Sequence, residues 1–235
     1  MSNESPGSLA NGDCPGKNKQ VVAVFDFDGT LTLVDSFLPF LRQVTGRRRF
    51  WFLLFCSSWD LVALVTCRIS SHEGKQRLVT RFLGGRSESE LQRACETYSN
   101  SKLNSLLNKS AMERLSWHQS QKHLVILLSA SIENYLIPWA RQQSIPMVIG
   151  TRLEIENERI TGKLSTPNCK GLEKVIRLQK AMPELSQFEV YSYGDSDADR
   201  RLAPISDHFL FRSFDTSTGL ARKFQLYKIL LTHLI

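Results

Sequence analysis

The sequence lacks the features of a disulfide framework or a zinc site. Its five cysteines, an odd number, are scattered, and none forms a C-x-x-C pair (Cys14, Cys56, Cys67, Cys95 and Cys169). The five histidines show no metal-type pairing either. An odd number of scattered cysteines without C-x-x-C spacing is typical of an intracellular protein whose thiols are reduced. The missing His/Cys ligand set argues against a zinc hydrolase.

The first residues lack an apolar run. Residues 1–19 are rich in Ser, Asn, Gly and Pro. A secretory signal peptide would need a hydrophobic segment here, so we expect a flexible tail and no export. The sequence thus favours a cytoplasmic protein, with contact to the inner face of the membrane left open.

The chain also lacks an uninterrupted membrane-spanning run. Residues 50–67 come closest, with 14 apolar positions of 18, but Asp60 and three hydroxyl residues interrupt them. A span needs about 20 predominantly apolar residues and resists a central Asp. Two alternatives stay open: a buried helix of an inserted cap, or a helix at a membrane interface, with residues 47–55 in contact. The second is suggested because Arg47-Arg48-Arg49 precede Phe and Trp residues.

The remaining composition is that of a globular protein. Hydrophobic residues make up 42% and charged residues 23% of the 235 positions, which excludes disorder of the whole chain. The net charge of +7 favours anionic partners. A nucleic-acid partner is not expected, because Arg47–Arg49 form the only basic cluster and no nucleic-acid-binding module accompanies it.

One stretch, residues 21–32 (VVAVFDFDGTLT), predicts a chemical centre. Residues 21–25 read as a buried strand. Asp26 and Asp28 follow, and because residues two apart point to the same side, both carboxylates should leave the strand end together, with Phe27 facing away. Gly29 allows a tight turn. Two like charges this close are costly unless a proton or a divalent cation neutralises them. For the Asp-x-Asp pattern alone, a solvated Asp-rich turn is an equal alternative.

The later half of the chain alternates between strands and helices. Mostly helical residues, 37 to about 110, separate it from the first strand, with helices expected over 73–83 and 87–115. Repeated βα units predict a doubly wound, mainly parallel Rossmann-like sheet whose ligands bind at the carboxyl ends of the strands. The further elements expected are strands over 123–128, 146–150, 188–193 and 209–211, a hairpin over 151–164 with its turn at Asn157-Glu158, and helices over 132–142, 170–181 and 220–235. Apolar residues at 172, 175, 176 and 178 mark the inner face of the helix over 170–181.

Four segments in order resemble the motifs of the haloacid dehalogenase superfamily, in its phosphoserine-phosphatase-like branch: DFDGTLTLVDSFLPFL, LSASIENYLIPWA, CKGLEKVIRL and YGDSDADRRLAPISDH. The resemblance spans residues 21 to about 211. It implies a catalytic α/β core (20–36 and 115–235) with a helical cap inserted at 37–114.

The resemblance also implies roles for the acidic residues. Asp26 would be the nucleophile that forms an aspartyl-phosphate, and Asp28 would be the general acid and base. Mg²⁺ would be held by Asp26, Asp195 and the main-chain carbonyl of Asp28. Asp199 would orient a metal-bound water or Lys170, with Asp197 a weaker candidate for that position.

Three residues would contact the substrate. Ser129 and Lys170 would bind phosphoryl oxygens. An isolated Ser at a strand end is more often a helix N-cap, and an isolated Lys before a helix is more often a surface charge. Asp35 occupies the place of the family's substrate-facing acid, and a role as a local turn or helix cap is an equal alternative.

The resemblance implies a Mg²⁺-dependent phosphatase for phosphate monoesters, with a small phosphoserine-like metabolite as the first expectation. The alternative is a lipid phosphate, such as phosphatidylglycerol phosphate, hydrolysed at a membrane surface. A catalytically silent binding module is the third reading, and the intact Asp pair, Lys170 and Asp195 argue against it.

Overall fold

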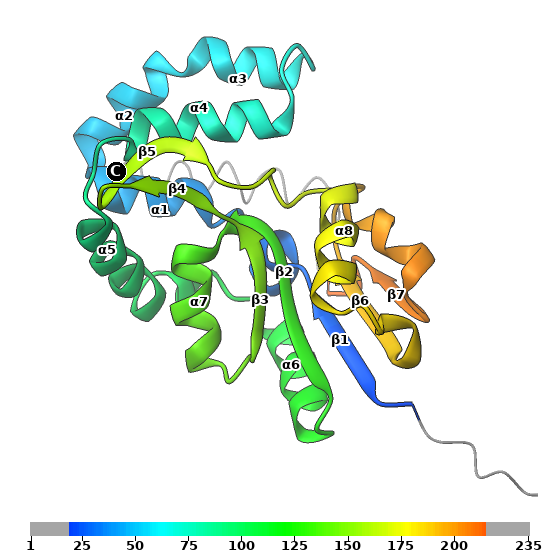
Figure 1. Cartoon of the computed structure of the whole chain (residues 1–235). Helices are drawn as coiled ribbons and strands as arrows, with labels where there is room; N and C mark the ends of the chain where they lie inside the picture. The colour runs from blue at the N-terminus through cyan, green and yellow to red at the C-terminus, as the bar shows by residue number, and fades with distance from the viewer. Residues whose placement is uncertain (1–18, 215–235) are drawn as a thin grey trace, which may run out of the picture.

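A five-stranded parallel sheet forms the centre of the molecule (Figure 1). The computed structural model describes residues 19–214, apart from the side chains of Leu61 and Val65. The predicted helix over 220–235 and nearly all of the predicted amino-terminal tail lie outside these residues. The strand order is β3-β2-β1-β6-β7, and all neighbouring strands run parallel. The predicted α/β fold class is therefore confirmed. The strands are β1 (Val21–Phe25), β2 (Leu124–Ile132), β3 (Met147–Thr151), β6 (Glu189–Gly194) and β7 (His208–Phe211).

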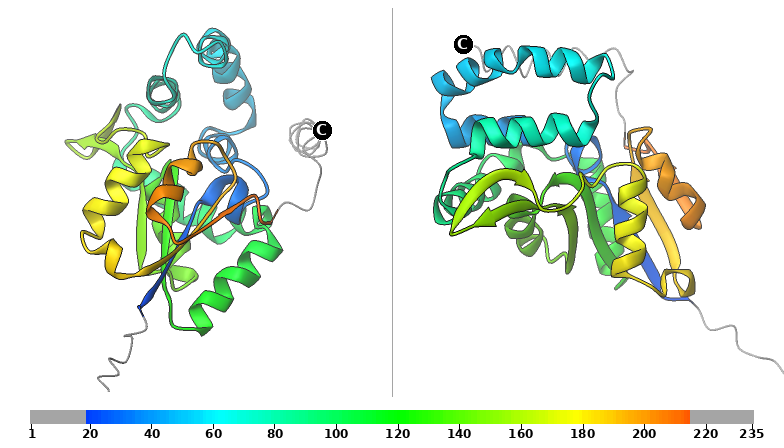
Figure 2. Two further views of the ribbon diagram at one scale, coloured as in Figure 1. Left: turned by 90° about the vertical axis from the view of Figure 1, so that its right-hand side faces the viewer. Right: turned by 45° about the horizontal axis from the view of Figure 1, so that its top comes forward.

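Helices cover both faces of the sheet, as Figure 2 shows edge-on. Alternate side chains of β1 enter different layers: Phe25 packs in the same cluster as Trp139, and Val24 in the same cluster as Leu178. This alternation explains why the β1 segment is apolar at every position, since both of its faces are buried. One face carries α6 (Lys109–Ser120) and α7 (Glu133–Gln142); the other carries α8 (Leu172–Ala181) with the short 3₁₀ helices η3 (Leu185–Gln187) and η4 (Asp199–Ile205).

A helical segment is inserted between β1 and α6. Its two ends pair with each other: Leu33 N–H donates to Leu106 O at 2.8 Å, and Asn108 N–H donates to Leu31 O at 2.8 Å. We propose this pairing as the base of the cap, near the boundaries expected at 37 and 114. After the tight turn over Phe27–Leu31, the segment contains α1 (Phe37–Thr45), α2 (Arg47–Cys56), α3 (Ser58–Val65), α4 (Ser71–Leu83), α5 (Glu88–Asn100) and the 3₁₀ helix η2 (Leu103–Leu106).

Two of the helical predictions were too long. The run over 50–67 is divided at Ser57, a buried residue whose hydroxyl donates to Leu53 O at 2.8 Å. The helix expected over 87–115 is divided into α5, η2 and the start of α6. Within residues 19–214, no helix has both the length and the apolar character needed to cross a bilayer.

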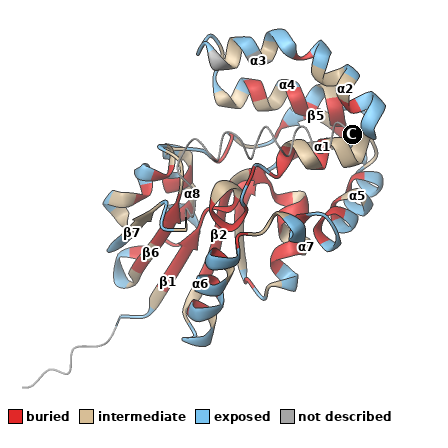
Figure 3. Cartoon of the chain, turned by 180° about the vertical axis from the view of Figure 1, so that it is seen from behind, coloured by how far each residue is buried: buried red, intermediate tan, exposed pale blue. Residues whose placement is uncertain are grey.

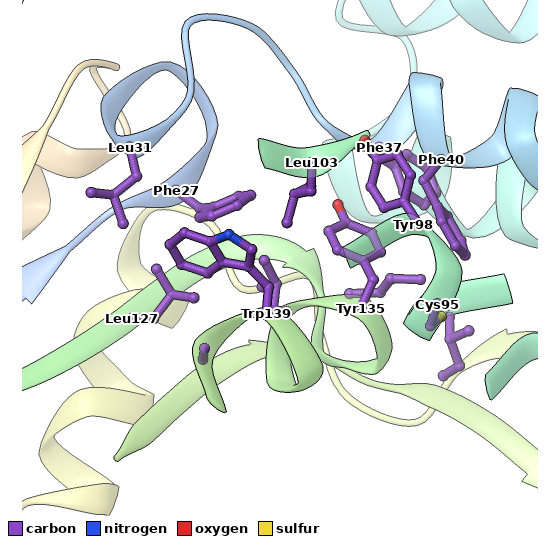
Figure 4. Packing of buried hydrophobic residues seen from close by; sticks show 14 of the residues in the cluster. Phe27, Leu31, Phe37, Phe40, Cys95, Tyr98, Leu103, Leu127, Tyr135 and Trp139 are labelled. Atoms are coloured by element: carbon purple, nitrogen blue, oxygen red, sulfur yellow. The ribbon is translucent and has the colours of Figure 1, made fainter. Parts of the chain in front are cut away.

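The inserted helices share a hydrophobic core with the sheet. Figure 4 shows Phe27 beside Trp139, with ring centroids 4.9 Å apart, and Tyr135 close to Phe40 and Tyr98. These rings belong to one cluster that joins α1 and α5 to α7. Part of the inserted segment is therefore anchored by aromatic packing.

A two-stranded hairpin also contacts the insertion. Strands β4 (Leu153–Glu156) and β5 (Arg159–Leu164) are antiparallel, and Asn157 and Glu158 have positive φ angles of 48° and 60°. Both residues lie in the left-handed region that a tight hairpin turn requires, so the predicted turn is confirmed. Thr80 of α4 donates its hydroxyl to Gly162 O at 2.7 Å, which fixes the hairpin against the inserted helices.

Candidate active site

A cavity of 310 Å³ lies between the carboxyl ends of β1 and β2 and the inserted helices. Of the predicted site residues, Asp26, Asp28, Asp35, Ser129, Lys170 and Asp199 line it. The inserted helices complete the wall with Phe37 of α1, Leu64 of α3, and Ser71, Gly74, Lys75 and Leu78 of α4. The structure thus brings residues that are far apart in sequence to one hollow at the sheet edge, where parallel α/β folds bind ligands.

The end of β1 positions the Asp pair. Asp26 N–H donates to Tyr193 O at 2.9 Å, which continues the ladder with β6 beyond the strand end. Phe27 is fully buried in the core, so Asp26 and Asp28 face the cavity together. Gly29 has φ of 84°, a left-handed conformation that favours glycine and turns the chain away.

Lys174 joins the ends of β1 and β6. Its ammonium donates to Asp26 Oδ1 and to Asp199 Oδ1, both at 2.6 Å, and all three side chains are buried. Burial alone would lower the pKa of Lys174, but Asp26 and Asp199 outweigh it and hold that pKa above its ordinary value. Lys174 is therefore a permanent cation beside Asp26.

Sequence reasoning assigned the lysine of the site to Lys170 and missed Lys174. Lys170 lines the cavity but is exposed, and the ammonium bonded to Asp26 belongs to the lysine four residues later, in the first turn of α8. A signal was present: Lys174 lies on the same stripe of α8 as Val175 and Leu178, where a cation is out of place unless paired. The expected apolar face was wrong at two positions, because Leu172 and Ile176 are exposed.

Asp199 and Asp195 come from the segment after β6. Asp199 accepts hydrogen bonds from Ser196 N–H at 3.0 Å and Ser196 Oγ at 2.5 Å, besides the bond from Lys174. Burial works to raise the pKa of Asp199, but Lys174 and Ser196 hold it below its ordinary value. Asp199 thus contacts Lys174 rather than the predicted Lys170. Asp197 lies at the surface, paired with Arg200 at 3.0 Å.

The carboxylates around Asp26 form a candidate cation site. Oxygens of Asp26, Asp195 and Asp199 lie within 4.8 Å of one another. Burial, together with Asp199 and Asp195, raises the pKa of Asp26 to about 8 against the opposing effect of Lys174. The single ammonium of Lys174 is shared between Asp26 and Asp199, so a further cation would relieve the charge at this cluster. All-oxygen ligands suit Mg²⁺, and the residues present fit that ion.

Asp28 is held by two hydrogen bonds. Its Oδ1 accepts from Ser36 N–H at 2.7 Å, and its Oδ2 accepts from the hydroxyl of Ser131. Burial raises the pKa of Asp28 to about 6, and Asp35 acts in the same direction. A carboxyl with this pKa exchanges its proton near neutral pH, as a general acid and base must.

Ser129 and Asp35 line the cavity and also accept hydrogen bonds from backbone N–H groups close to them in sequence. Ser129 is fully buried, and its hydroxyl accepts from Ser131 N–H at 3.0 Å; it does not cap α7, which begins after Ile132. Asp35 Oδ1 accepts from the N–H groups of Phe37 and Leu38, at 3.0 and 3.1 Å. Asp35 therefore caps α1, the second of its two expected roles, while it also lines the cavity.

Lys75 of α4 was not expected in the site. Its ammonium donates to Ala130 O at 2.6 Å and lies 4.9 Å from the ring centroid of Phe37. Burial lowers the pKa of Lys75. No sequence pattern distinguished Lys75 from the two arginines of the helix, Arg77 and Arg81, because its position in the cavity depends on how α4 lies over β2.

Comparisons with known proteins agree with this arrangement. A model of the haloacid dehalogenase-like hydrolase family matches residues 23–204. Protein CicA of Caulobacter vibrioides is 29% identical over 201 residues, which cover 84% of this chain and 88% of CicA.

Two solved structures share the fold. A protein of unknown function from Bordetella pertussis Tohama I has a TM-score of 0.71 at 23% identity, covering 90% of this chain and 97% of that one. A phosphoserine phosphatase, solved as a phospho-aspartyl intermediate analogue, has a TM-score of 0.57 at 12% identity, covering 82% and 86%. Because the family match includes both Asp clusters and most of the chain, this protein belongs to the haloacid dehalogenase-like hydrolase family.

Proposed function

We propose that this protein is a Mg²⁺-dependent phosphatase that hydrolyses phosphate monoesters through an aspartyl-phosphate at Asp26. The observation that carries the proposal is the shared cavity of Asp26 and Asp28, with Lys174 bonded to Asp26. The solved phosphoserine phosphatase that shares the fold was captured as an analogue of a phospho-aspartyl intermediate, which supports the same chemistry here.

In the first step, a carboxylate oxygen of Asp26 attacks phosphorus and the bond to the leaving oxygen breaks. Asp28 gives its proton to that alkoxide, and the raised pKa of Asp28 keeps a protonated fraction available near neutral pH. In the second step, Asp28 takes a proton from water, whose oxygen attacks phosphorus and releases phosphate from Asp26.

Other residues of the chain hold and neutralise the reacting groups. Lys174 fixes one oxygen of Asp26 and opposes the rise in the pKa of that carboxyl that burial causes. Ser129 and Lys170 would receive phosphoryl oxygens at the cavity wall. Asp26, Asp195 and the main-chain carbonyl of Asp28 would hold Mg²⁺, with Asp199 beside them, and the ion would neutralise charge on the transferring group.

The first candidate substrate is a small phosphorylated metabolite of the phosphoserine type. Asp35 and Lys75 place one carboxylate and one amine in a cavity of 310 Å³, which suits a compact ester with charged groups. The second candidate is a lipid phosphate. The apolar wall of Phe37, Leu64 and Leu78 favours it.

The test is phosphate release by the purified chain with and without Mg²⁺. Substrates are phosphoserine, histidinol phosphate, a sugar phosphate and phosphatidylglycerol phosphate in detergent. We expect Mg²⁺-dependent release from at least one ester, and no turnover by Asp26→Asn, because an amide cannot form the phosphoenzyme. Turnover retained in Asp26→Asn would refute the assignment of Asp26 as the nucleophile. No release from any ester in Mg²⁺ would favour a silent binding module.

A further inference from the structure

Helices α2 and α3 carry large apolar side chains into solvent. Four residues define this surface, the α2–α3 face: Phe52, Phe55, Trp59 and Val62, whose exposed fractions are 65%, 78%, 82% and 51%. Figures 1 and 3 show α3 on the outer side of α4, farthest from the sheet. Large apolar side chains that gather on the outside of two consecutive helices favour an interaction site.

The inner sides of the same helices are already packed. Phe50 is buried, and a Cβ at Gly74 of α4 would lie 3.1 Å from Leu64 of α3, so the two helices are in close contact. Asp60 is bonded to Arg77 at 2.7 Å and to Arg81 at 2.8 Å, both on α4. The exposed side chains therefore lie on the outer side of helices whose inner side is packed against α4. Asp60, the only acid in residues 47–65, is paired with arginines of α4 and adds no free negative charge to this face.

Three exposed arginines lie at the start of this face. Arg47, Arg48 and Arg49 form the first turn of α2, and no acidic residue accompanies them there. The helix dipole disfavours cations in a first turn, so three arginines there weaken the helix. Arg48 and Arg49 are exposed and can meet an external anion.

The positive charge beside the α2–α3 face indicates which kind of partner could cover it. A second copy of this chain carries the same net charge of +7 and the same arginines, so its charge does not complement this face. An anionic lipid surface complements that charge, and Trp and Phe next to Arg suit the headgroup boundary of a bilayer.

We propose that the α2–α3 face docks on an anionic lipid bilayer, with Phe55 and Trp59 inserted at the headgroup level and Arg47–Arg49 against the lipid phosphates. Leu64, on the inner side of α3, lines the catalytic cavity. Docking therefore brings the cavity wall within one helix diameter of the lipid surface. The docking does not depend on the proposed phosphatase activity.

The test is binding of the full chain to vesicles of phosphatidylcholine alone and of phosphatidylcholine mixed with phosphatidylglycerol. We expect co-sedimentation with the mixed vesicles only, and a blue shift of tryptophan emission that Trp59→Ser removes. Phe55→Ser/Trp59→Ser should weaken binding at least about tenfold, because affinity scales with inserted apolar area. Replacing the three arginines by glutamine should weaken it on the order of a hundredfold.

Trp117→Ser is the matched control. Trp117 is also exposed, at 42%, but lies on α6 of the core, so its loss should leave vesicle binding unchanged. Far-UV circular dichroism and thermal unfolding of each variant show that it is folded.

Failure of the full chain to bind mixed vesicles would overturn the proposal, as would unchanged binding by Phe55→Ser/Trp59→Ser. A dimer in light scattering that this double variant abolishes would assign the face to a second copy and also overturn it. Release of phosphate from a soluble ester, measured on the same samples, reports separately on the proposed function.

Discussion

Lys174→Met is the sharpest test of how the site is built. The ammonium of Lys174 lies 2.6 Å from both Asp26 and Asp199, and the three side chains are 3%, 8% and 1% exposed. Methionine keeps most of the length of lysine and removes the charge. The substitution therefore leaves two buried carboxylates facing each other without a counter-ion.

Removal of one partner from a buried ion pair costs about 3–5 kcal/mol of unfolding free energy, because the remaining charge stays buried and unpaired. Here one cation serves two carboxylates, so we expect a loss of that size in the absence of divalent cations. Mg²⁺ should restore more stability to Lys174→Met than to the wild type, since the same carboxylates lie in the candidate cation site. Turnover should be lost in both conditions.

The assay is urea unfolding followed by far-UV circular dichroism, with and without Mg²⁺, and Lys170→Met as the matched control. Lys170 is exposed, so its variant should change stability by less than about 0.5 kcal/mol. A loss below about 1 kcal/mol in Lys174→Met, or an equal loss in Lys170→Met, would refute the assignment of Lys174 as the cation that holds Asp26.

Three other predictions concern the surroundings of the site. Gly194→Ala should destabilise the fold by about 1–3 kcal/mol and lower turnover, because the new Cβ would lie 2.8 Å from Cγ of Asp199; urea unfolding with wild-type stability would contradict this. Ser131→Ala should move the alkaline limb of the pH–rate profile upward, since the Ser131 hydroxyl stabilises charged Asp28 and lowers its pKa; a downward move would contradict the general-acid role. Burial lowers the pKa of His118 to about 4 from 6.5, so the unfolded chain binds more protons between these values and stability falls as pH falls through that window. Acidification from pH 7 to pH 5 should therefore cost the wild type about 2 kcal/mol more than His118→Gln in urea titrations, and equal losses would contradict the role of His118.

The sequence by itself determined the sheet and the place of the Asp pair. Both depend on local rules: apolar β-branched runs form buried strands, residues two apart share a side, and parallel strands bring their carboxyl ends to one edge. Residues 26, 28 and 129, which these rules place at strand ends, line one cavity, whereas Asp195, expected at such an end too, lies near Asp26 but is not among the lining residues. The hairpin turn at Asn157-Glu158 was equally local.

Tertiary structure decided which cations face those carboxylates and which apolar helices face water. Lys170 lies just before α8 and Lys174 lies in its first turn, and only the packing of α8 against β2 and η4 buries Lys174 and leaves Lys170 exposed. Lys75 enters the cavity because α4 crosses the end of β2. The run over 50–67 allowed either a buried or a surface helix. The break at Ser57 and the packing of α3 on α4 left Phe55 and Trp59 outside. These outcomes depend on contacts between segments distant in sequence, about which local periodicity carries no information.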